Sequence, residues 1–393
     1  MMMLSQQRRI FAALLAVAFT APSVAGFSTT SSTSGLSASQ LASTSQSSDL
    51  LLDRREAFVK SSAAIVAATG VSLLPSFTSP ASAAATNKIP EWALENGVKF
   101  PKLALNTVGL SASDTNRALS YAVAAGVKHV DFHPGAERDG VAQFLKENPG
   151  SRTKLFLNTK IRKAPPGTSP SEAAERTRNQ IDEDLAALGV SSVDMLMLRD
   201  SPDREVIQAQ WAVLEEALAQ KKTRSVGVIN FCEKALTCVL ETAKVKPALN
   251  YYMLHVGMGT DPRGLRSFGE SRGIRTFAYG AVGEPGPNAE LLSSPVLKRI
   301  GDAHGKKPEE VALRWVTQNG CAVSVRPTLD FGLGSGTCTE ENKCKEGFEA
   351  RASSFAWSLS KEQMEELNAL TSPNDNPTLF SSSGCPDAFV MKK

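Results

Sequence analysis

Three short apolar runs, separated by two long helical stretches, decide the fold: Leu-Phe-Leu-Asn-Thr at 155–159, Met-Leu-Met-Leu at 195–198 and Ser-Val-Gly-Val-Ile at 225–229. Apolar runs of this length, bounded by polar segments, are typical of buried strands. The stretches between them, 171–188 and 201–220, are predicted helices: the first ends in Gly189, and the second has apolar residues three and four positions apart, which is the spacing of an amphipathic helix. The alternation of strand and helix predicts βα units on a parallel sheet.

The same alternation continues in both directions along the chain. The candidate strands are 103–107, 129–132, 155–159, 195–198, 225–229, 248–251, 276–279 and 322–325. Eight strands with helices between them predict a single-domain α/β fold, the (β/α)8 TIM barrel. A doubly wound sheet is the alternative, but it requires a glycine-rich nucleotide loop after the first strand, where this chain has Val108-Gly109-Leu110.

The first 53 residues do not have the composition of a folded domain, because no Asp or Glu occurs before Asp49. Residues 1–26 combine a basic start, an apolar core and a small-residue end, which is the layout of a signal peptide. Residues 27–53 are rich in Ser and Thr and favour a transit peptide, with a plain disordered linker as the alternative.

A further signal follows at 54–83. It opens with Arg54-Arg55 and ends in the small-residue cleavage box Ala81-Ser82-Ala83, a twin-arginine pattern; an amphipathic helix is the alternative. The order of signal, transit and twin-arginine segments resembles the targeting of thylakoid-lumen proteins in algae with complex plastids. We therefore expect a cleavable leader and a plastid location, with the thylakoid lumen as the further destination. The mature chain would comprise a barrel at 84–372 and a tail at 373–393.

The charge balance and spacing of residues exclude several classes of function. The chain carries 43 Lys and Arg against 40 Asp and Glu, a net charge of +3, so no domain-wide basic excess favours nucleic acid. No apolar run is long enough for a span of about 18 residues, so no membrane span is expected in the mature chain. The spacing of Cys and His predicts no metal site. We expect a small-molecule partner, and the sequence leaves the oligomeric state undefined.

Several segments, taken in chain order, resemble the aldo-keto reductases. The similarity is to their N-terminal hairpin at 94–103, to their second to sixth strands at 125–131, 155–160, 193–198, 224–231 and 246–250, and to a nicotinamide-stacking Tyr at 279. It extends to about residue 370. The resemblance implies a barrel enzyme that reduces carbonyls with NADPH.

The family's catalytic residues are an Asp, a Tyr, a Lys and a His, and only two of them match. Asp131 and Lys160 stand at the expected places. The Tyr should follow Asp131 by five residues, yet 132–140 contain no Tyr, and Arg199 replaces the His. Loss of a general acid costs typically about 10²- to 10⁴-fold in rate, so the resemblance predicts weak or altered activity.

Two replacements for the missing groups are open. His133 could serve as the proton donor, and Arg199 could polarise a carbonyl as a fixed cation. Alternatively, His133 is a solvated turn residue and Arg199 forms an ion pair with Asp200. Asp131 and Lys160 could also persist as a buried pair without a catalytic task.

The resemblance implies NADP(H) as the cofactor, with some of its contacts changed. The cofactor-binding candidates are Asn230 for the carboxamide, Tyr251 in place of a Gln, Tyr279 as the stacking platform, Arg326 in place of the Lys on the 2′-phosphate, and Arg351 near the adenosine. Ile229 replaces a Ser that normally binds the amide. These changes leave NADP(H) binding open.

An insertion after the eighth strand contains the glycine-rich run 332–336, which is either a phosphate loop or a flexible loop. Cys338 and Cys344 could close a seven-residue disulfide loop in an oxidising compartment, or remain two unrelated thiols. Cys232 and Cys238 are six apart on the predicted fifth helix, so a bridge between them is not expected.

The sequence therefore supports an NADP(H)-dependent carbonyl oxidoreductase with altered activity. The alternatives are a non-catalytic barrel that binds a nucleotide or small ligand, and an interaction protein built on the same scaffold. A lumenal location would favour the alternatives, because little nicotinamide cofactor is expected there. Val108 stands where many family members place a pocket Trp, so the substrate is not predicted.

Overall fold

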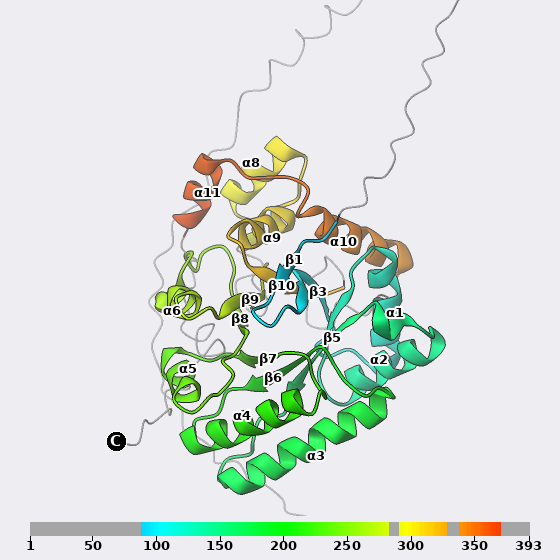
Figure 1. Ribbon diagram of the computed structural model, residues 1–393. Helices are drawn as coiled ribbons and strands as arrows, with labels where there is room; N and C mark the ends of the chain where they lie inside the picture. Colours follow the sequence, from blue (N-terminus) through cyan, green and yellow to red (C-terminus); the bar gives the residue numbers. More distant parts are fainter. Residues whose placement is uncertain (1–87, 283–290, 328–337, 339, 371–393) are drawn as a thin grey trace, which may run out of the picture. The chain divides into compact units, whose positions relative to one another are not determined.

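The computed structural model describes residues 88–282, 291–327, 338 and 340–370. Its centre is a closed barrel of eight parallel strands in the order β10-β3-β4-β5-β6-β7-β8-β9, with the helices packed around it (Figure 1). The eight strands lie at the eight predicted places, so the prediction of a (β/α)8 barrel is confirmed. The leader at 1–83 and the tail at 373–393 lie outside the described residues.

The barrel strands end at residues that matter for the site. They are β3 (Leu103–Asn106), β4 (His129–Asp131), β5 (Phe156–Ile161), β6 (Met195–Arg199), β7 (Val226–Ile229), β8 (Leu249–Met253), β9 (Arg275–Tyr279) and β10 (Ala322–Val325). The described helices are α1 (Ala112–Ala124), α2 (Ala136–Glu147), α3 (Pro170–Leu188), α4 (Arg204–Ala219), α5 (Glu233–Leu240), α6 (Leu265–Glu270), α8 (Pro295–His304), α9 (Pro308–Gln318), α10 (Glu341–Ser353) and α11 (Lys361–Asn368), with short 3₁₀ turns at Ser151–Thr153 and Pro262–Gly264.

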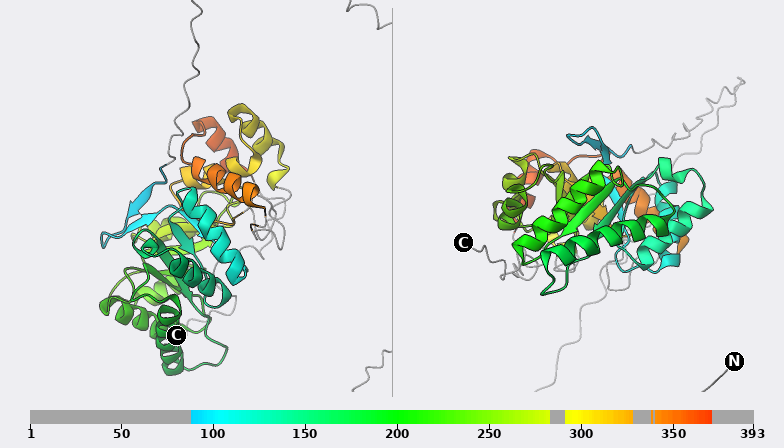
Figure 2. Two further views of the ribbon diagram at one scale, coloured as in Figure 1. Left: turned by 90° about the vertical axis from the view of Figure 1, so that its right-hand side faces the viewer. Right: turned by 60° about the horizontal axis from the view of Figure 1, so that its bottom comes forward.

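Local sequence explains where the helices begin and end. The Ser111 hydroxyl accepts a hydrogen bond from the Asp114 amide and caps α1. Gly189 ends α3 with φ at 66°, a left-handed conformation that suits glycine. Helix α4 begins at Arg204, later than the predicted 201, because Asp203 caps it by accepting from two backbone amides of its first turn. Figure 2 shows α3 and α4 lying side by side over the barrel.

A two-stranded antiparallel hairpin, β1 (Glu91–Ala93) and β2 (Lys99–Pro101), precedes the barrel as predicted. Its Phe100 contacts the rings of His129, Phe156 and Phe277 edge-on at the amino ends of the strands. Burial lowers the pKa of His129 to about 4, so this imidazole is neutral in the core. The hairpin and these rings fill the amino end of the barrel, and the polar groups gather at the other end.

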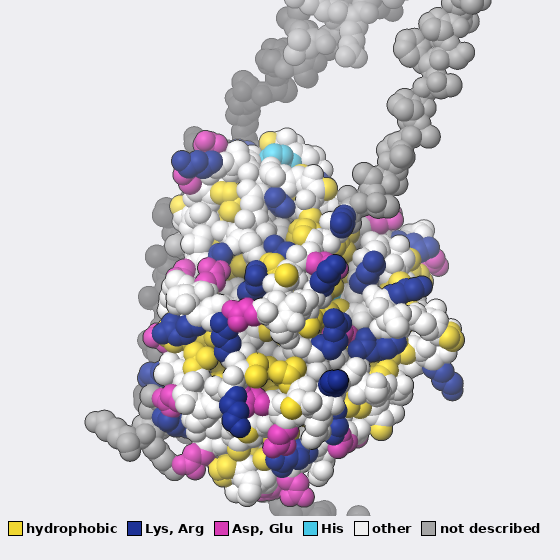
Figure 3. Space-filling view, in the orientation of Figure 1, with side chains coloured by type: hydrophobic (Ala, Val, Ile, Leu, Met, Phe, Trp, Pro, Cys, Tyr) yellow, Lys and Arg dark blue, Asp and Glu magenta, His cyan; other side chains and the backbone are white. Residues whose placement is uncertain are grey.

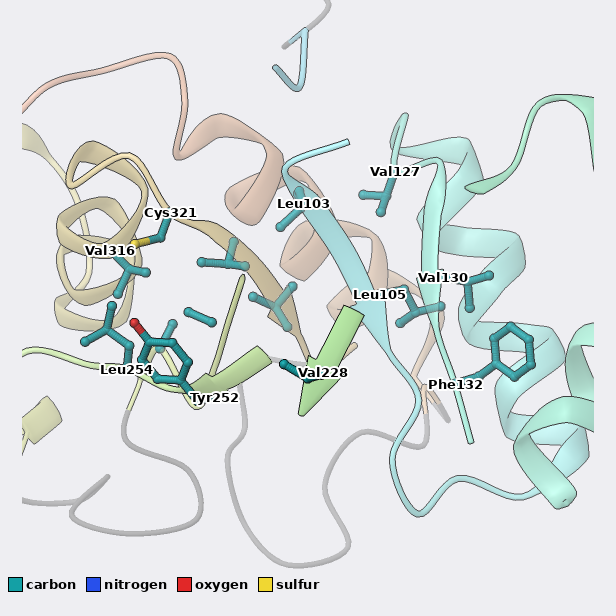
Figure 4. Packing of buried hydrophobic residues seen from close by; sticks show 14 of the residues in the cluster. Leu103, Leu105, Val127, Val130, Phe132, Val228, Tyr252, Leu254, Val316 and Cys321 are labelled. Atoms are coloured by element: carbon teal, nitrogen blue, oxygen red, sulfur yellow. The ribbon is translucent and has the colours of Figure 1, made fainter. Parts of the chain in front are cut away.

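A second layer of apolar side chains lies between the strands and the helices. Figure 4 shows part of it, including Leu105, Val130 and Phe132. Tyr252 belongs to this outer layer, whereas its neighbour Tyr251 belongs to the barrel interior, because successive strand residues face opposite sides. This difference between two adjacent tyrosines becomes important for the site.

The described surface mixes both signs of charge. On the face in Figure 3, Lys and Arg side chains are interspersed with Asp and Glu. Among the described residues, we find no helix with both the length and the apolar character needed to cross a membrane.

Candidate active site

A pocket opens at the carboxyl ends of the barrel strands, and we call it the barrel-mouth pocket. Its volume is about 260 Å³, just below the range of about 300–1,000 Å³ for organic ligands. The lining residues come from most of the strand ends and from two helices: Asn106, Val108, His133, Arg199, Ile229, Asn230, Tyr251, Tyr279, Gly280, Ala281, Val282, Glu309, Glu310, Leu313, Ser324, Val325, Arg326, Ala350 and Arg351. Seven of the nine predicted site residues therefore meet in one cavity.

The other two, Asp131 and Lys160, form an ion pair beneath the pocket and do not line it. Each side chain is 1% exposed. Asp131 ends β4, and its Oδ1 accepts from Lys160 and from Asn158 Nδ2 at 3.0 Å. Its Oδ2 accepts from Ser324 Oγ at 2.6 Å and Tyr251 Oη at 2.7 Å. Four donors thus surround the carboxylate and offset the cost of burying it.

Tyr251 is the residue that connects the buried pair to the pocket. Its ring lines the barrel-mouth pocket, while its hydroxyl donates to Asp131 and accepts from Asn106 Nδ2 at 3.2 Å. The Lys160 ammonium lies 5.7 Å from the centre of the Tyr251 ring. The structure therefore places a phenol beside the Asp–Lys pair, as the family pattern requires, but the phenol comes from β8 rather than from the segment after β4.

The ionisation of this cluster follows from burial and from the ion pair. Burial alone would raise the pKa of Asp131, but the Lys160 charge and the hydrogen bonds hold it below its usual value. Burial lowers the pKa of Lys160, and the charge of Asp131 opposes that shift. Burial and the Asp131 charge raise the pKa of Tyr251 well above its usual value. Tyr251 is therefore a neutral hydroxyl at neutral pH.

His133 lines the pocket and is held by Glu137, a residue that the sequence reasoning did not select. Glu137 Oε2 accepts from the His133 backbone amide at 2.9 Å and lies 3.0 Å from His133 Nδ1. The same Oε2 accepts from Thr107 Oγ1, and Glu137 Oε1 accepts from the Gly109 amide. Burial would raise the pKa of Glu137, but the hydrogen bonds from His133 and Gly109 keep it lowered. His133 is a fixed, half-buried partner of Glu137 rather than a solvated turn residue.

Arg199 ends β6 and lines the pocket, as its predicted place required. The alternative expected from the sequence, an ion pair between Arg199 and Asp200, does not form. Asp200 Oδ2 instead lies 3.5 Å from Lys163 Nζ. Among the described residues, Arg199 forms no ion pair, and its Nε is buried without a hydrogen-bond partner.

Asn230 and Tyr279 form a fixed pair on the pocket wall. The Tyr279 hydroxyl donates to Asn230 Oδ1 at 2.9 Å, and its ring packs edge-on against Tyr251. Asn230 has a φ of 57°, which is uncommon outside glycine although Asn tolerates it. Left-handed non-glycine residues of this kind gather at functional sites. Tyr279 therefore presents a rigid aromatic face to a ligand.

Two arginines line the pocket on the β10 side. Arg326 follows β10, and Arg351 lies on α10, where it is buried and donates to the Gly347 carbonyl at 3.2 Å. Cys338 and Cys344 form a disulfide at the start of this helix. The glycine-rich run at 332–336 lies outside the described residues. Cys238 is a buried free thiol, so no bridge joins it to Cys232, as expected.

The role of the Tyr251 hydroxyl was missed from the sequence, although a signal was present. The resemblance assigns Tyr251 to the cofactor, because it stands where the family has a Gln. The predicted strand 248–251 nevertheless ended in this Tyr, and residues at the carboxyl ends of barrel strands carry the chemistry of such enzymes. Asn106, Asn158 and Ser324 were missed as well, since buried amides and hydroxyls on strands have no distinctive spacing.

The closed barrel and the pocket at its carboxyl end define the architecture of the (β/α)8 enzymes. Within that class the chain belongs to the aldo/keto reductase family, whose model matches residues 102–371. Family membership places it among carbonyl oxidoreductases that use a nicotinamide cofactor and act on small molecules.

Individual relatives are distant. The chain is 27% identical over 299 residues to a 9,11-endoperoxide prostaglandin H2 reductase of Trypanosoma cruzi, covering 75% of this chain and 94% of the relative. It is 29% identical over 243 residues to a morphine 6-dehydrogenase of Pseudomonas putida, covering 59% and 79%. An aldo/keto reductase structure from Brucella melitensis superposes with a TM-score of 0.61 at 23% identity, covering 72% and 99%, which supports the fold.

Proposed function

We propose that the protein is an NADP(H)-dependent reductase of small aldehydes or ketones, with Tyr251 as its proton donor. The observation that carries the proposal is the position of Tyr251. Its hydroxyl lies 2.7 Å from Asp131 Oδ2, and its ring lines the pocket. This phenol supplies the acid that is absent from 132–140. Asp131 and Lys160 then have a catalytic task, although neither touches the pocket itself.

The proton follows a short path from the buried pair to the substrate. Tyr251 transfers its hydroxyl proton to the carbonyl oxygen as a hydride reaches the carbonyl carbon, which gives the alcohol. The phenolate left behind accepts a hydrogen bond from Asn106. It regains a proton from the Lys160 ammonium through the Asp131 carboxylate that contacts both groups. The lowered pKa of Lys160 suits it to this step, and solvent later restores its proton.

The pocket residues fit a nicotinamide dinucleotide. Tyr279 offers an aromatic face held by Asn230, and the latter stands where the family binds the carboxamide. Arg326 and Arg351 place two cations on the β10 side for phosphate groups, and the planar guanidinium of Arg326 suits a 2′-phosphate. Bound in its reduced form, the cofactor supplies the hydride.

One observation favours the non-catalytic alternative. Asp131 and Lys160 are sealed below Tyr251, and the raised pKa of this phenol makes it a reluctant acid. A barrel that binds a nucleotide without turnover would show the same static arrangement. The two functions differ only in whether the Tyr251 proton leaves, so turnover decides between them.

The test has a binding step and a turnover step. Purified full-length protein should show a higher melting temperature and quenched tryptophan fluorescence with NADPH, and a smaller response to NADH. NADPH oxidation should then exceed the no-enzyme rate with at least some members of a panel of aldehydes and ketones. Tight NADPH binding with background rates throughout the panel would establish the non-catalytic barrel instead.

We also propose, on the sequence of residues 1–83 alone, that the protein is delivered to the plastid. Further processing near Ala84 would send it to the thylakoid lumen, where little nicotinamide cofactor is expected and the non-catalytic function is favoured. N-terminal sequencing of the protein from isolated thylakoid lumen should begin close to Ala84. If protein recovered from the stroma instead has its N-terminus near residue 54, the last step of this route, processing near Ala84 for the lumen, is wrong.

A further inference from the structure

We infer that Arg199 binds an anionic group on the substrate, so that the substrates are short oxo acids carrying a carboxylate a few bonds from the carbonyl. This inference rests on the proposed reductase function and specifies its substrate class. It begins from a feature that the family pattern does not explain: the half-buried guanidinium at the end of β6 has no carboxylate partner among the described residues.

The neighbouring charges are already paired. Asp200, next to Arg199 in the chain, lies 3.5 Å from Lys163. In the pocket region, Glu137 pairs with His133, and Asp131 forms an ion pair with Lys160. Arg199 is thus the cation at this side of the pocket that no described carboxylate neutralises, and its Nε donor is buried without an acceptor. A buried donor without an acceptor is unfavourable, and a bound anion would remove that cost.

The remaining charged residues of the pocket lie across the barrel from Arg199. Glu309 and Glu310 are on α9, which packs against β10, and Arg326 follows β10. In the closed order of strands, β6 and β10 are separated by three strands on either side. Glu310 is engaged by Lys306 at 3.0 Å. The β10 side therefore suits the cofactor phosphates, and Arg199 remains for the substrate.

The distance to the proton donor sets the size of the substrate. Arg199 pairs in register with Ile229, and Ile229 pairs with Tyr251, so the three residues lie at one level of adjacent strands. Two strand spacings place the backbones of Arg199 and Tyr251 about 10 Å apart. Both side chains are long and line the same small pocket. A carbonyl at the Tyr251 hydroxyl and a carboxylate at the Arg199 guanidinium must therefore belong to a short molecule.

A guanidinium binds a carboxylate through two parallel hydrogen bonds, which a neutral ester cannot match. The test compares short 2-oxo, 3-oxo and 4-oxo acids with their methyl esters as substrates, on wild type, Arg199→Gln and Arg199→Lys. We expect Arg199→Gln to raise KM for the best acid by about 10- to 100-fold and to leave its ester nearly unchanged. Arg199→Lys should recover only part of the loss, since it keeps the charge and loses the planar fork.

Arg162→Gln is the matched control, because it removes one guanidinium directly after the neighbouring strand β5, where Arg162 pairs with Glu183 at 3.8 Å and does not line the pocket. It should leave acid and ester kinetics unchanged. If Arg199→Gln lowers kcat/KM equally for acids and esters, Arg199 acts on the carbonyl and the inference is wrong. The same holds if wild type prefers the esters.

A binding measurement separates this inference from the proposed function. Calorimetric titration of the NADP⁺-bound protein, which cannot reduce the ligand, with an oxo acid should show binding to wild type and an affinity lower by about 10-fold or more in Arg199→Gln. If the acid binds in this Arg199-dependent way but is not reduced, the reductase proposal fails and the anion site stands. If the esters are reduced while the acids neither bind nor react, the reductase stands and the anion site fails.

Discussion

Replacing Lys160 by Met removes one member of an ion pair in which both side chains are 1% exposed. Removing one partner of a buried pair usually costs about 3–5 kcal/mol, because the other charge is left without compensation. Asp131 keeps three hydrogen-bond donors, Tyr251, Ser324 and Asn158. We therefore expect a loss near the lower end, about 3 kcal/mol of unfolding free energy at neutral pH.

In this variant, the contribution of Asp131 to the free energy of unfolding should depend on pH with the opposite sign. In the wild type the folded-state pKa of Asp131 is lowered, so its contribution is present above the unfolded-state pKa and is lost as pH falls through the folded-state pKa. Without Lys160 the buried carboxyl has a raised folded-state pKa. The variant should then be most destabilised at neutral pH, and its difference from wild type should shrink as pH falls through that raised value.

Urea unfolding of the full-length chain, followed by circular dichroism at about pH 8 and about pH 5, measures both quantities. The double variant Lys160→Met with Asp131→Asn is the control. The buried Asn158 Oδ1 has no hydrogen-bond partner, so that amide can turn to accept from the new one, and the double variant should recover much of the loss. Equal unfolding free energies for wild type and Lys160→Met at both pH values would refute the buried ion pair.

Three further predictions concern the supports of the site. Cys338→Ser opens the Cys338–Cys344 loop and should cost roughly 2 kcal/mol, with a reductant lowering the melting temperature of wild type more than that of the variant. Glu137→Gln should cost about 1–3 kcal/mol at neutral pH, and the difference should vanish as pH falls through the lowered pKa of Glu137; a constant difference in urea unfolding would speak against it. Gly140→Ala drives a Cβ into the Ala112 carbonyl and should cost about 1–3 kcal/mol, whereas an unchanged melting temperature would show that α1 and α2 pack less closely than described.

The barrel could be predicted from the sequence because its strands are apolar on both faces. The runs at 195–198 and 225–229 are buried throughout, and the gaps between strands were long enough for helices. Strand limits shifted by one or two residues, as for β8, which continues to Met253. Helix α4 begins three residues later than the spacing of its apolar residues predicts. The reason is that the Asp203 side chain accepts the capping hydrogen bonds and so fixes the first turn of the helix at Arg204.

The candidate site was only partly predictable, because its chemistry depends on contacts between distant segments. The strand-end rule and the family pattern located Asp131, Lys160 and Arg199. They did not show that Tyr251, 120 residues after Asp131, places its hydroxyl on that carboxylate. Such a contact depends on barrel closure and on the length of a Tyr side chain, and neither produces a residue spacing that can be recognised in the sequence. Likewise, the lack of an Arg199–Asp200 pair became visible only when Lys163 was seen beside Asp200.

The account depends most on Tyr251 as the proton donor, and adjacent tyrosines provide the test. Tyr252→Phe removes a buried hydroxyl that bonds Thr276 outside the pocket, whereas Tyr251→Phe removes the one that bonds Asp131. The measurement is the single-turnover rate of NADPH oxidation by a saturating carbonyl substrate in the two variants. We predict a loss of about 10²- to 10⁴-fold for Tyr251→Phe and a near wild-type rate for Tyr252→Phe. An undiminished rate in Tyr251→Phe would contradict the account.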